Sequence, residues 1–422
     1  MSDYGFISNL MIRASWGKTG NQAIGTYQTL ARIGGNGEYP WDGGSGTNLG
    51  FQISSASNPN LKWETTTQTN IGLDLALFRS RLRITTEYYD KVTDDLLMSR
   101  ELPRTTGLSS IIDNVGSMGN KGWEFTVDGD INIGNLRWTT GLSLTASETT
   151  VLDLGNDKFL SYMAGGSGHS VNIPIMFLTP GEPFGQIMGF GYEGTWNLGE
   201  EDEAARYGQM PGDPRYTDLN DDGKIDYDHD FKVIGNALPN FIFGLNNQFK
   251  LHNWELTFLW QGTSGNDLFN VARIRRESTR EGYSVEKLNR WTPENQNTDV
   301  PALHTAQYRH DYREDWNAAH PNNPLISTVT FPASGSQAIS RWIEDASYVR
   351  LKNLTLAYNV PVTRFVSNLR IFASGTNLLT FTKYSGFDPE VSSFTDTDGR
   401  LGTDYNNYPP SRFYNFGVDV TF

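Results

Sequence analysis

Cysteine is missing from the whole of the 422-residue chain. Its absence excludes disulfide bonds, thiolate metal sites and cysteine nucleophiles. Long apolar stretches are missing as well, since no run reaches the roughly 18 residues that a membrane-spanning helix requires. This pattern does not exclude a membrane-spanning β-barrel, because only every second residue of a barrel strand faces lipid.

Positive charge is scarce. The chain has 34 Lys and Arg against 48 Asp and Glu, which gives a net charge of −14 at pH 7. It shows no basic stripe or arginine-rich arm, so we expect no nucleic-acid partner. The first residues also lack the basic start, apolar run and small-residue cleavage site of a signal peptide. Glycine (43 residues) and aromatic residues (13%) are plentiful, and both favour a β-rich, turn-rich protein.

Roughly ten segments alternate apolar and polar residues, which is the pattern of a strand with one apolar face. In the first, Ile12, Ala14 and Trp16 alternate with Arg13 and Ser15. The segments cover residues 10–16, 61–77, 82–89, 122–131, 136–146, 241–249, 254–261, 348–360, 369–374 and 413–422. The alternation slips near Lys352, which predicts a β-bulge. Most segments reach the roughly 9–11 residues with which a tilted strand crosses a bilayer.

The connections between these segments alternate in length. Tight turns follow Leu77, Ile131, Phe249 and Val360, whereas long loops cover residues 18–61, 94–121, 147–239, 263–346 and 379–411. Short turns on one rim and long extracellular loops on the other are typical of an outer-membrane barrel. Alternation alone fits a soluble antiparallel sheet with one buried face equally well. Loop length and the Trp and Tyr residues near many strand ends favour the membrane protein.

The C-terminal segment alternates up to the last residue. Its apolar positions are Tyr414, Phe416, Val418, Val420 and Phe422. A terminal aromatic residue that closes an alternating strand resembles the signal by which outer-membrane barrels are recognised for insertion. We therefore predict that these five residues form the barrel-insertion signal.

An acidic loop, "DLNDDGKIDYDHD", covers residues 218–230. A calcium loop supplies oxygens from its first, third, fifth, seventh and ninth positions and a carboxylate from its twelfth, with glycine at the sixth. The candidate calcium ligands are Asp218, Asn220, Asp222, Lys224 (through its carbonyl), Asp226 and Asp230. His229 occupies the twelfth position and is a poor calcium ligand, so we expect the neighbouring Asp230 to close the site. The alternative is a surface turn held by hydrogen bonds from Asp and Asn side chains.

Other groups give no catalytic pattern. The acidic run Glu200, Glu201, Asp202 and Glu203 is typical of a solvated loop. No nucleophile, zinc-protease or phosphate-loop motif occurs, so we expect no enzyme and no required cofactor beyond a structural Ca²⁺. Substrate-binding residues are unknown. The aromatic candidates in the long loops are Tyr27, Trp41, Tyr162, Tyr192, Trp196, Tyr308, Trp316 and Tyr384, and packing of the loops is the alternative role for each.

An ordered series of segments resembles the C-terminal barrel region of SusC/RagA-type TonB-dependent transporters. The series includes "LMIRASWGKTGNQAIG", "NPNLKWETTTQTNIGLDLALF", "NVGSMGNKGWEFTVDGDI", "VIGNALPNFIFGLNNQF", "LRIFASGTNLLTFTKYSGFDPEV" and "YPPSRFYNFGVDVTF". The resemblance implies an all-β fold, an antiparallel transmembrane β-barrel of about 22 strands around a plug, in the Gram-negative outer membrane. It also implies import of an oligosaccharide or peptide, a SusD-like surface lipoprotein as partner, and energy from the TonB complex.

The sequence departs from this family in strand number and in its missing parts. It shows roughly ten strands and no plug domain, TonB-contact segment or signal peptide. We therefore expect residues 1–422 to be a C-terminal part of a longer receptor that is not transport-competent alone, because open sheet edges are not tolerated in lipid. The alternative is a secreted, calcium-stabilised all-β glycan-binding protein or glycoside hydrolase.

Overall fold

The computed structural model describes residues 6–22, 25–39, 48–108, 110–163, 173–277, 284–321, 325, 338–361, 366–393 and 401–422. The chain divides into two compact units. The first comprises Met1–Val127, Thr145–Phe159 and Thr179–Phe184, and the second comprises Asp128–Leu144, Leu160–Leu178 and Gly185–Phe422. Each unit is described by itself.

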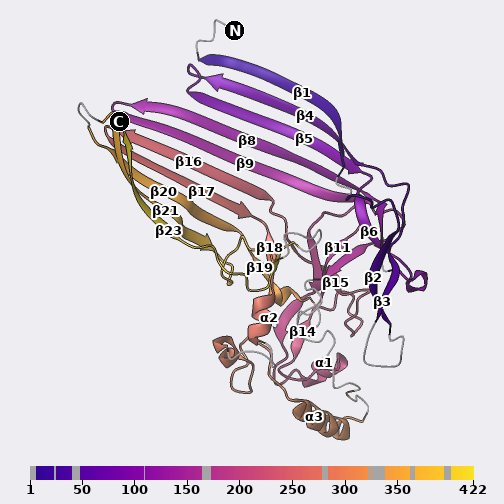
Figure 1. Cartoon of the computed structure of the whole chain (residues 1–422). Helices are drawn as coiled ribbons and strands as arrows, with labels where there is room; N and C mark the ends of the chain where they lie inside the picture. The colour runs from indigo at the N-terminus through magenta and orange to yellow at the C-terminus, as the bar shows by residue number, and fades with distance from the viewer. Residues whose placement is uncertain are drawn as a thin grey trace. The chain divides into compact units, whose positions relative to one another are not determined.

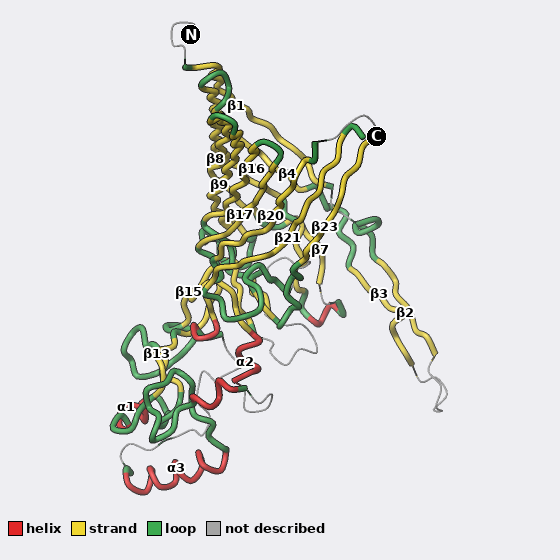
Figure 2. Tube along the Cα trace, turned by 90° about the vertical axis from the view of Figure 1, so that its left-hand side faces the viewer, coloured by secondary structure: helices red, strands yellow, loops and turns green. Residues whose placement is uncertain are grey.

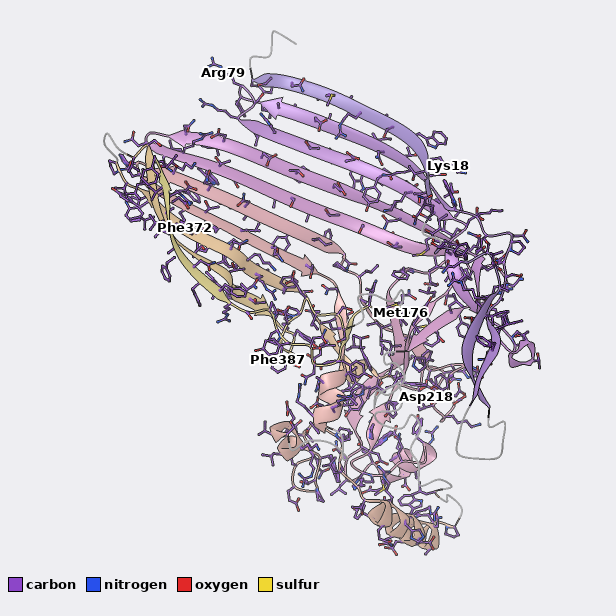
Figure 3. The ribbon with its side chains drawn as sticks, in the orientation of Figure 1. Lys18, Arg79, Met176, Asp218, Phe372 and Phe387 are labelled. Atoms are coloured by element: carbon purple, nitrogen blue, oxygen red, sulfur yellow. The ribbon has the colours of Figure 1, made fainter. Side chains whose placement is uncertain are left out.

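In the first unit, long strands follow one another in the order β1-β4-β5-β8-β9 (Figure 1). Their bounds are Ile7–Asn21 for β1, Glu64–Leu77 for β4, Leu82–Asp94 for β5, Ser117–Ile133 for β8 and Leu136–Asp153 for β9. A tight turn joins β4 to β5, and Figure 3 shows Arg79 in this turn and Lys18 near the opposite end of the strands. Two short pairs, β2 (Arg32–Tyr39) with β3 (Asn48–Ser55) and β6 (Leu97–Glu101) with β7 (Ser110–Asn114), fold within the first two long loops.

In the second unit, parts of β8 and β9 continue into the order β16-β17-β20-β21-β23 (Figure 1). Their bounds are Phe241–Leu251 for β16, Trp254–Ser264 for β17, Tyr348–Asn359 for β20, Asn368–Thr382 for β21 and Phe413–Thr421 for β23. The pairs from β16 to β23 are all antiparallel. Each of the ten predicted segments is therefore a strand of the ten-stranded sheet, which confirms the predicted fold class.

The predicted bulge at Lys352 is confirmed. Leu351 pairs with Trp260, whereas Asn353 pairs with Leu259, so Lys352 is the extra residue of β20. The register against β21 shifts at the same place. The extra residue keeps Leu351 on the same face of the sheet as Leu354, because their partners Trp260 and Phe258 are two residues apart. The bulge therefore preserves one continuous apolar face.

The apolar face of the long strands is exposed. In β1, Ile12 and Trp16 are 74% and 71% accessible, and in β23 Phe416 is equally open. A soluble sheet buries its apolar face, whereas a barrel strand presents that face to lipid. The opposite face carries ion pairs, such as Arg13 with Asp74 at 2.7 Å. This division of the two faces fits a membrane barrel and not a soluble sandwich.

The long loops of the second unit fold into short elements of their own (Figure 2). One four-stranded sheet has the order β10-β11-β12-β15, β13 pairs with β14, and β18 pairs with β19 and β22. Their bounds are Leu160–Met163 (β10), Pro174–Leu178 (β11), Gln186–Phe190 (β12), Tyr192–Thr195 (β13), Pro214–Tyr216 (β14), Phe231–Asn236 (β15), Asp267–Asn270 (β18), Ile343–Asp345 (β19) and Thr403–Asp404 (β22). The helices are α1 (Glu201–Arg206), α2 (Val271–Glu277) and α3 (Ala306–Ala319), with 3-10 turns η1 (Arg104–Thr106) in the first unit and η2 (Val285–Asn289) and η3 (Ser340–Trp342) in the second. Within the described residues, none of these helices has the length and apolarity to span a bilayer.

These loop elements enclose a large hydrophobic core. Ile175, Met176, Ile187, Phe190 and Phe269 are completely buried in it. The core belongs to the loops because the long strands turn their apolar side chains outward and leave none to fill an interior of their own. The sequence pattern did not predict these loop elements, since strands of two to six residues are too short for alternation to stand out.

Candidate functional site

The acidic loop, residues 218–230, is closed by hydrogen bonds at both ends. Gly223, at the sixth position, has φ +81° and donates its N–H to Asp218 Oδ2 at 2.8 Å. Asp230 is only 1% exposed, and its two oxygens accept the N–H groups of Leu219 at 2.7 Å and Asp226 at 2.9 Å. Asp230 thus closes the loop as predicted, but in the structure it does so through backbone hydrogen bonds.

The middle of the loop is shaped by side-chain to backbone bonds. Asp222 Oδ1 accepts the N–H of Lys224 at 2.9 Å, and Asp226 Oδ1 accepts the N–H groups of Asp228 and His229, each at 2.9 Å. Asn220 Oδ1 accepts from the Asp222 N–H at 3.4 Å. These are the hydrogen bonds of the surface-turn alternative. Calcium binding remains a prediction.

The loop is anchored to the segment that follows α1. The Tyr207 hydroxyl donates to Asp218 Oδ2 at 3.2 Å, and the Tyr207 ring stacks on Trp196 with centroids 5.8 Å apart. Burial acts to raise the pKa of Asp218, but the hydrogen bonds from Gly223 and Tyr207 outweigh it and lower that pKa. Figure 3 shows Asp218 among the loop elements, away from Phe372 on β21.

The predicted ligands do not act as one set. Asp218 and Asp230 spend carboxylate oxygens on backbone N–H groups. Asp222 and Asp226 lie instead beside His229, with ligand atoms of all three within 4.8 Å of one another. The hydrogen bond to Asp226 raises the pKa of His229. The sequence comparison with a calcium loop missed His229, because that pattern has no place for an imidazole.

The acidic run at residues 200–203 forms the first turn of α1 and the residue before it. Glu200 and Glu203 lie 3.5 Å and 3.9 Å from the guanidinium of Arg215. Arg215 also covers the ring of Trp196. The run therefore makes surface ion pairs with Arg215, in line with the prediction of a solvated segment.

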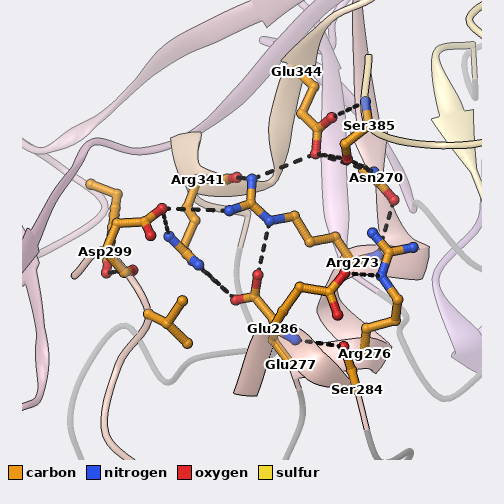
Figure 4. Close-up of polar contacts among 12 residues, drawn as sticks. Asn270, Arg273, Arg276, Glu277, Ser284, Glu286, Asp299, Arg341, Glu344 and Ser385 are labelled. Atoms are coloured by element: carbon orange, nitrogen blue, oxygen red, sulfur yellow. Dashed lines mark hydrogen bonds and ion pairs between the residues drawn. The ribbon is translucent and has the colours of Figure 1, made fainter. Parts of the chain in front are cut away.

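Arg341 and Arg273 form a buried ion network in the second unit (Figure 4). Glu277 of α2 binds both cations, at 2.8 Å from Arg341 and 2.9 Å from Arg273. Asp299 contacts both as well, and Arg273 lies 3.5 Å from Glu344. Both guanidinium groups lie over the ring of Trp342. The network ties α2, η3 and β19 together, and no motif in the sequence indicates it.

Glu390 and Asp388 form a second network, on the polar face of β20. Arg350 binds both carboxylates, with 2.7 Å between Nη2 and Asp388 Oδ2. Glu390 Oε1 also accepts from the Tyr348 hydroxyl at 2.6 Å and from Gln261 Nε2 at 2.9 Å. We name the segment Tyr384–Val391 the strap. Its ends, Tyr384 and Val391, pack in a small apolar cluster, so the strap is fixed along its length.

A polar cavity of about 350 Å³ lies in the first unit, where β5, β8 and β9 end. Its lining includes Asp94, Asp95, Arg100, Asn114 and Asp153. The lining contains no aromatic ring, so it offers hydrogen bonds and charge but no stacking surface.

Most aromatic candidates pack the loops. Trp196, Trp316 and Tyr384 are buried, whereas Tyr27 and Tyr308 are exposed. Tyr162 and Tyr192 are half-buried against the loop core. Trp41 lies outside the described residues. The packing role is therefore the better account of most of them.

The C-terminal strand places its apolar residues as predicted. Tyr414, Phe416, Val418, Val420 and Phe422 are all exposed. Phe416 pairs with Ala373 and Val418 with Ile371 on β21, so the alternating residues share the apolar face of the sheet. Their role in barrel insertion remains a prediction.

Comparison with known proteins agrees with the predicted resemblance. The family model described as "TonB dependent receptor-like, beta-barrel" matches residues 3–258. The TonB-dependent receptors P3 and P26 of Formosa agariphila are 33% and 34% identical, each over 100% of this chain. The TonB-dependent receptor SusC of Bacteroides thetaiotaomicron is 25% identical over 100% of this chain. The chain spans 40%, 41% and 38% of these three relatives.

Solved structures show the same fold. The structure of the RagAB peptide transporter superposes with a TM-score of 0.77 at 23% identity, covering 100% of this chain and 41% of the other. The family is one of receptors and transporters and not of enzymes, which agrees with the absence of a catalytic motif. On the family match, the chain belongs to the TonB-dependent receptor-like β-barrel family.

Proposed function

We propose that this chain is part of an outer-membrane receptor that imports a nutrient with energy from TonB. Family membership and the exposed apolar face of the long strands are the observations that carry this proposal. Because the chain spans about two fifths of its relatives, the activity belongs to the longer protein. Import by the isolated chain is not expected, since open strand edges are costly in lipid.

The substrate class we propose is an oligosaccharide or a peptide. Similarity to SusC and to the RagAB peptide transporter supports this range. The partners we propose are a SusD-like surface lipoprotein, the TonB complex acting through the N-terminal part of the longer protein, and outer-membrane lipids. The secreted glycan-binding protein or hydrolase loses support, because the family is not enzymatic and the apolar face is not buried.

An uptake experiment tests the proposal. Cells that carry the full-length receptor are given labelled oligosaccharides and labelled peptides, with and without a functional TonB. Uptake that needs both the receptor and TonB is expected, and the label that accumulates identifies the substrate class. Equal uptake without the receptor, or recovery of the receptor as a soluble monomer, would refute the proposal.

For the acidic loop we propose a structural role in holding the loop core in place. The loop connects α1 to β15, and Tyr207 links it to the packed ring of Trp196. Calcium is the ion that the sequence predicts for this loop. The position of His229 suggests a different ion.

A further inference from the structure

Asp222, Asp226 and His229 gather two carboxylates and one imidazole in the acidic loop, with ligand atoms within 4.8 Å of one another. We propose that these three residues bind a transition-metal dication of the zinc type, in place of the calcium that the sequence predicts. The role is structural, and the ion links the middle of the loop to its end.

The separation of the donor atoms suits a small ion. His229 Nδ1 lies 3.2 Å from Asp226 Oδ1. Two ligands bound to a tetrahedral zinc at about 2.0–2.1 Å are separated by roughly 3.3 Å. These two atoms can therefore bind one zinc ion with almost no movement, and Asp222 is near enough to be the third ligand.

The donor types distinguish zinc from calcium. Calcium takes about 6–8 oxygen ligands, whereas imidazole nitrogen favours zinc, copper and nickel. The loop has too few free oxygens for calcium, because Asp230 uses both of its oxygens and Asp218 uses Oδ2 on backbone N–H groups. Three protein ligands and a water complete a zinc shell.

The loop holds these ligands in place and in reach of solvent. Asp230 fixes the backbone of Asp226, and the Lys224 N–H orients Asp222 Oδ1. Six aspartates lie within residues 218–230 against a single lysine, Lys224. This excess of negative charge raises the local concentration of a dication.

The bland explanation is a surface ion pair between His229 and Asp226. His310 and Asp311 form such a pair on α3, with 3.5 Å between Nδ1 and Oδ1. The two histidines match in exposure, with side chains 52% and 54% accessible. Among the described residues, the three-residue cluster occurs at His229 and not at His310. His310 is therefore a matched control.

The test uses the full-length receptor, purified in detergent and stripped with a chelator. Zn²⁺ is titrated against a chromophoric competitor, and Ca²⁺ is titrated in parallel by calorimetry. We expect one Zn²⁺ equivalent whose affinity falls at least tenfold in His229→Ala and in Asp222→Asn and stays unchanged in His310→Ala. His229→Glu restores an oxygen at the closing position, so it is expected to weaken Zn²⁺ and strengthen Ca²⁺ binding.

Two results would overturn the proposal. One is Zn²⁺ binding that is the same in wild type and His229→Ala, and the other is a loop that binds Ca²⁺ more tightly than Zn²⁺ and is indifferent to His229. A folding defect is recognised from heat-modifiable migration in detergent gels. His229→Gln, which keeps a polar side chain of similar length, then replaces the alanine variant.

Discussion

Arg350 and Asp388 form a buried ion pair, with 2.7 Å between Nη2 and Oδ2 and side chains only 1% and 6% exposed. The pair joins β20 to the strap, 38 residues further along the chain. Glu390 adds a second carboxylate to the same guanidinium. The last long loop is therefore fixed to the polar face of the sheet by charge as well as by packing.

Removing Asp388 should release the strap. The Asp388→Ala variant leaves Arg350 with an uncompensated buried charge, a change that costs about 3–5 kcal/mol in comparable pairs. The rate of chymotrypsin cleavage at Phe387, which is exposed, is expected to rise strongly. Asp113→Ala is the control, because the Arg100–Asp113 pair is long (3.9 Å) and exposed, and such pairs contribute about 0–1 kcal/mol. Equal cleavage of the two variants would contradict the assigned role.

Adding a methyl group at Gly262 should disturb the pairing of β17 with β20. A Cβ there would lie 2.1 Å from the backbone oxygen of Tyr348, which cannot move without breaking the ladder. Gly262→Ala is expected to destabilise the full-length receptor by more than the roughly 1–3 kcal/mol of ordinary overpacking. Thermal unfolding in detergent measures the loss. Gly17→Ala in β1 is the matched control, since no atom lies within 4 Å of its added Cβ; a similar loss in both would refute the steric account.

Truncating the last residue tests the predicted insertion signal. Phe422 is 91% exposed, so Phe422→Ala removes few contacts within the chain. We expect less receptor in the outer membrane, while the inserted fraction keeps its wild-type melting temperature. Membrane fractionation and gel migration give the two readouts. Phe387→Ala, another exposed phenylalanine, should leave insertion unchanged. Normal insertion of the Phe422 variant would rule out the signal.

Acid should loosen α3 through His304. Burial lowers the pKa of His304 below its ordinary value of about 6.5, against the opposing influence of Asp213 and of the Pro211 carbonyl. The folded segment therefore binds a proton less readily than the unfolded one. Its stability is constant above the ordinary pKa, and falls with acid between that pKa and the folded value.

Limited proteolysis of α3 across this pH range measures the effect. His304→Phe retains a ring to stack on Tyr308, whose centroid is 4.7 Å away, but cannot titrate. The ratio of wild-type to variant cleavage cancels the pH dependence of the protease. This ratio should rise as pH falls, and a flat ratio would show that His304 does not titrate in this range. His310→Phe controls for an exposed histidine.

The sequence predicted the long strands well, because their period-two pattern is set by lipid on one side and polar groups on the other. It even indicated the bulge at Lys352, where the pattern slips by one residue. Strand ends were less accurate. The segment predicted to end at Ala146 runs on to Asp153, since beyond the membrane span polar residues can occupy either face.

The loop contacts were beyond prediction for a physical reason. Arg341 meets Glu277 across 64 residues and Gln261 meets Glu390 across 129. Such pairs depend on how the loops pack, and no local pattern records that packing. The acidic loop was found from its aspartates and glycine, but the importance of His229 became visible only once its ring was placed beside Asp226.

The core of the second unit limits how loops of this protein can be exchanged. Ile175 belongs to the third long loop, Phe269 to the fourth and Leu401 to the fifth, and all three belong to one cluster. A loop grafted alone from a relative would remove one wall of that cluster and expose the others. Changes of specificity by engineering or by evolution should therefore come through surface substitutions, or through transplantation of all three loops together.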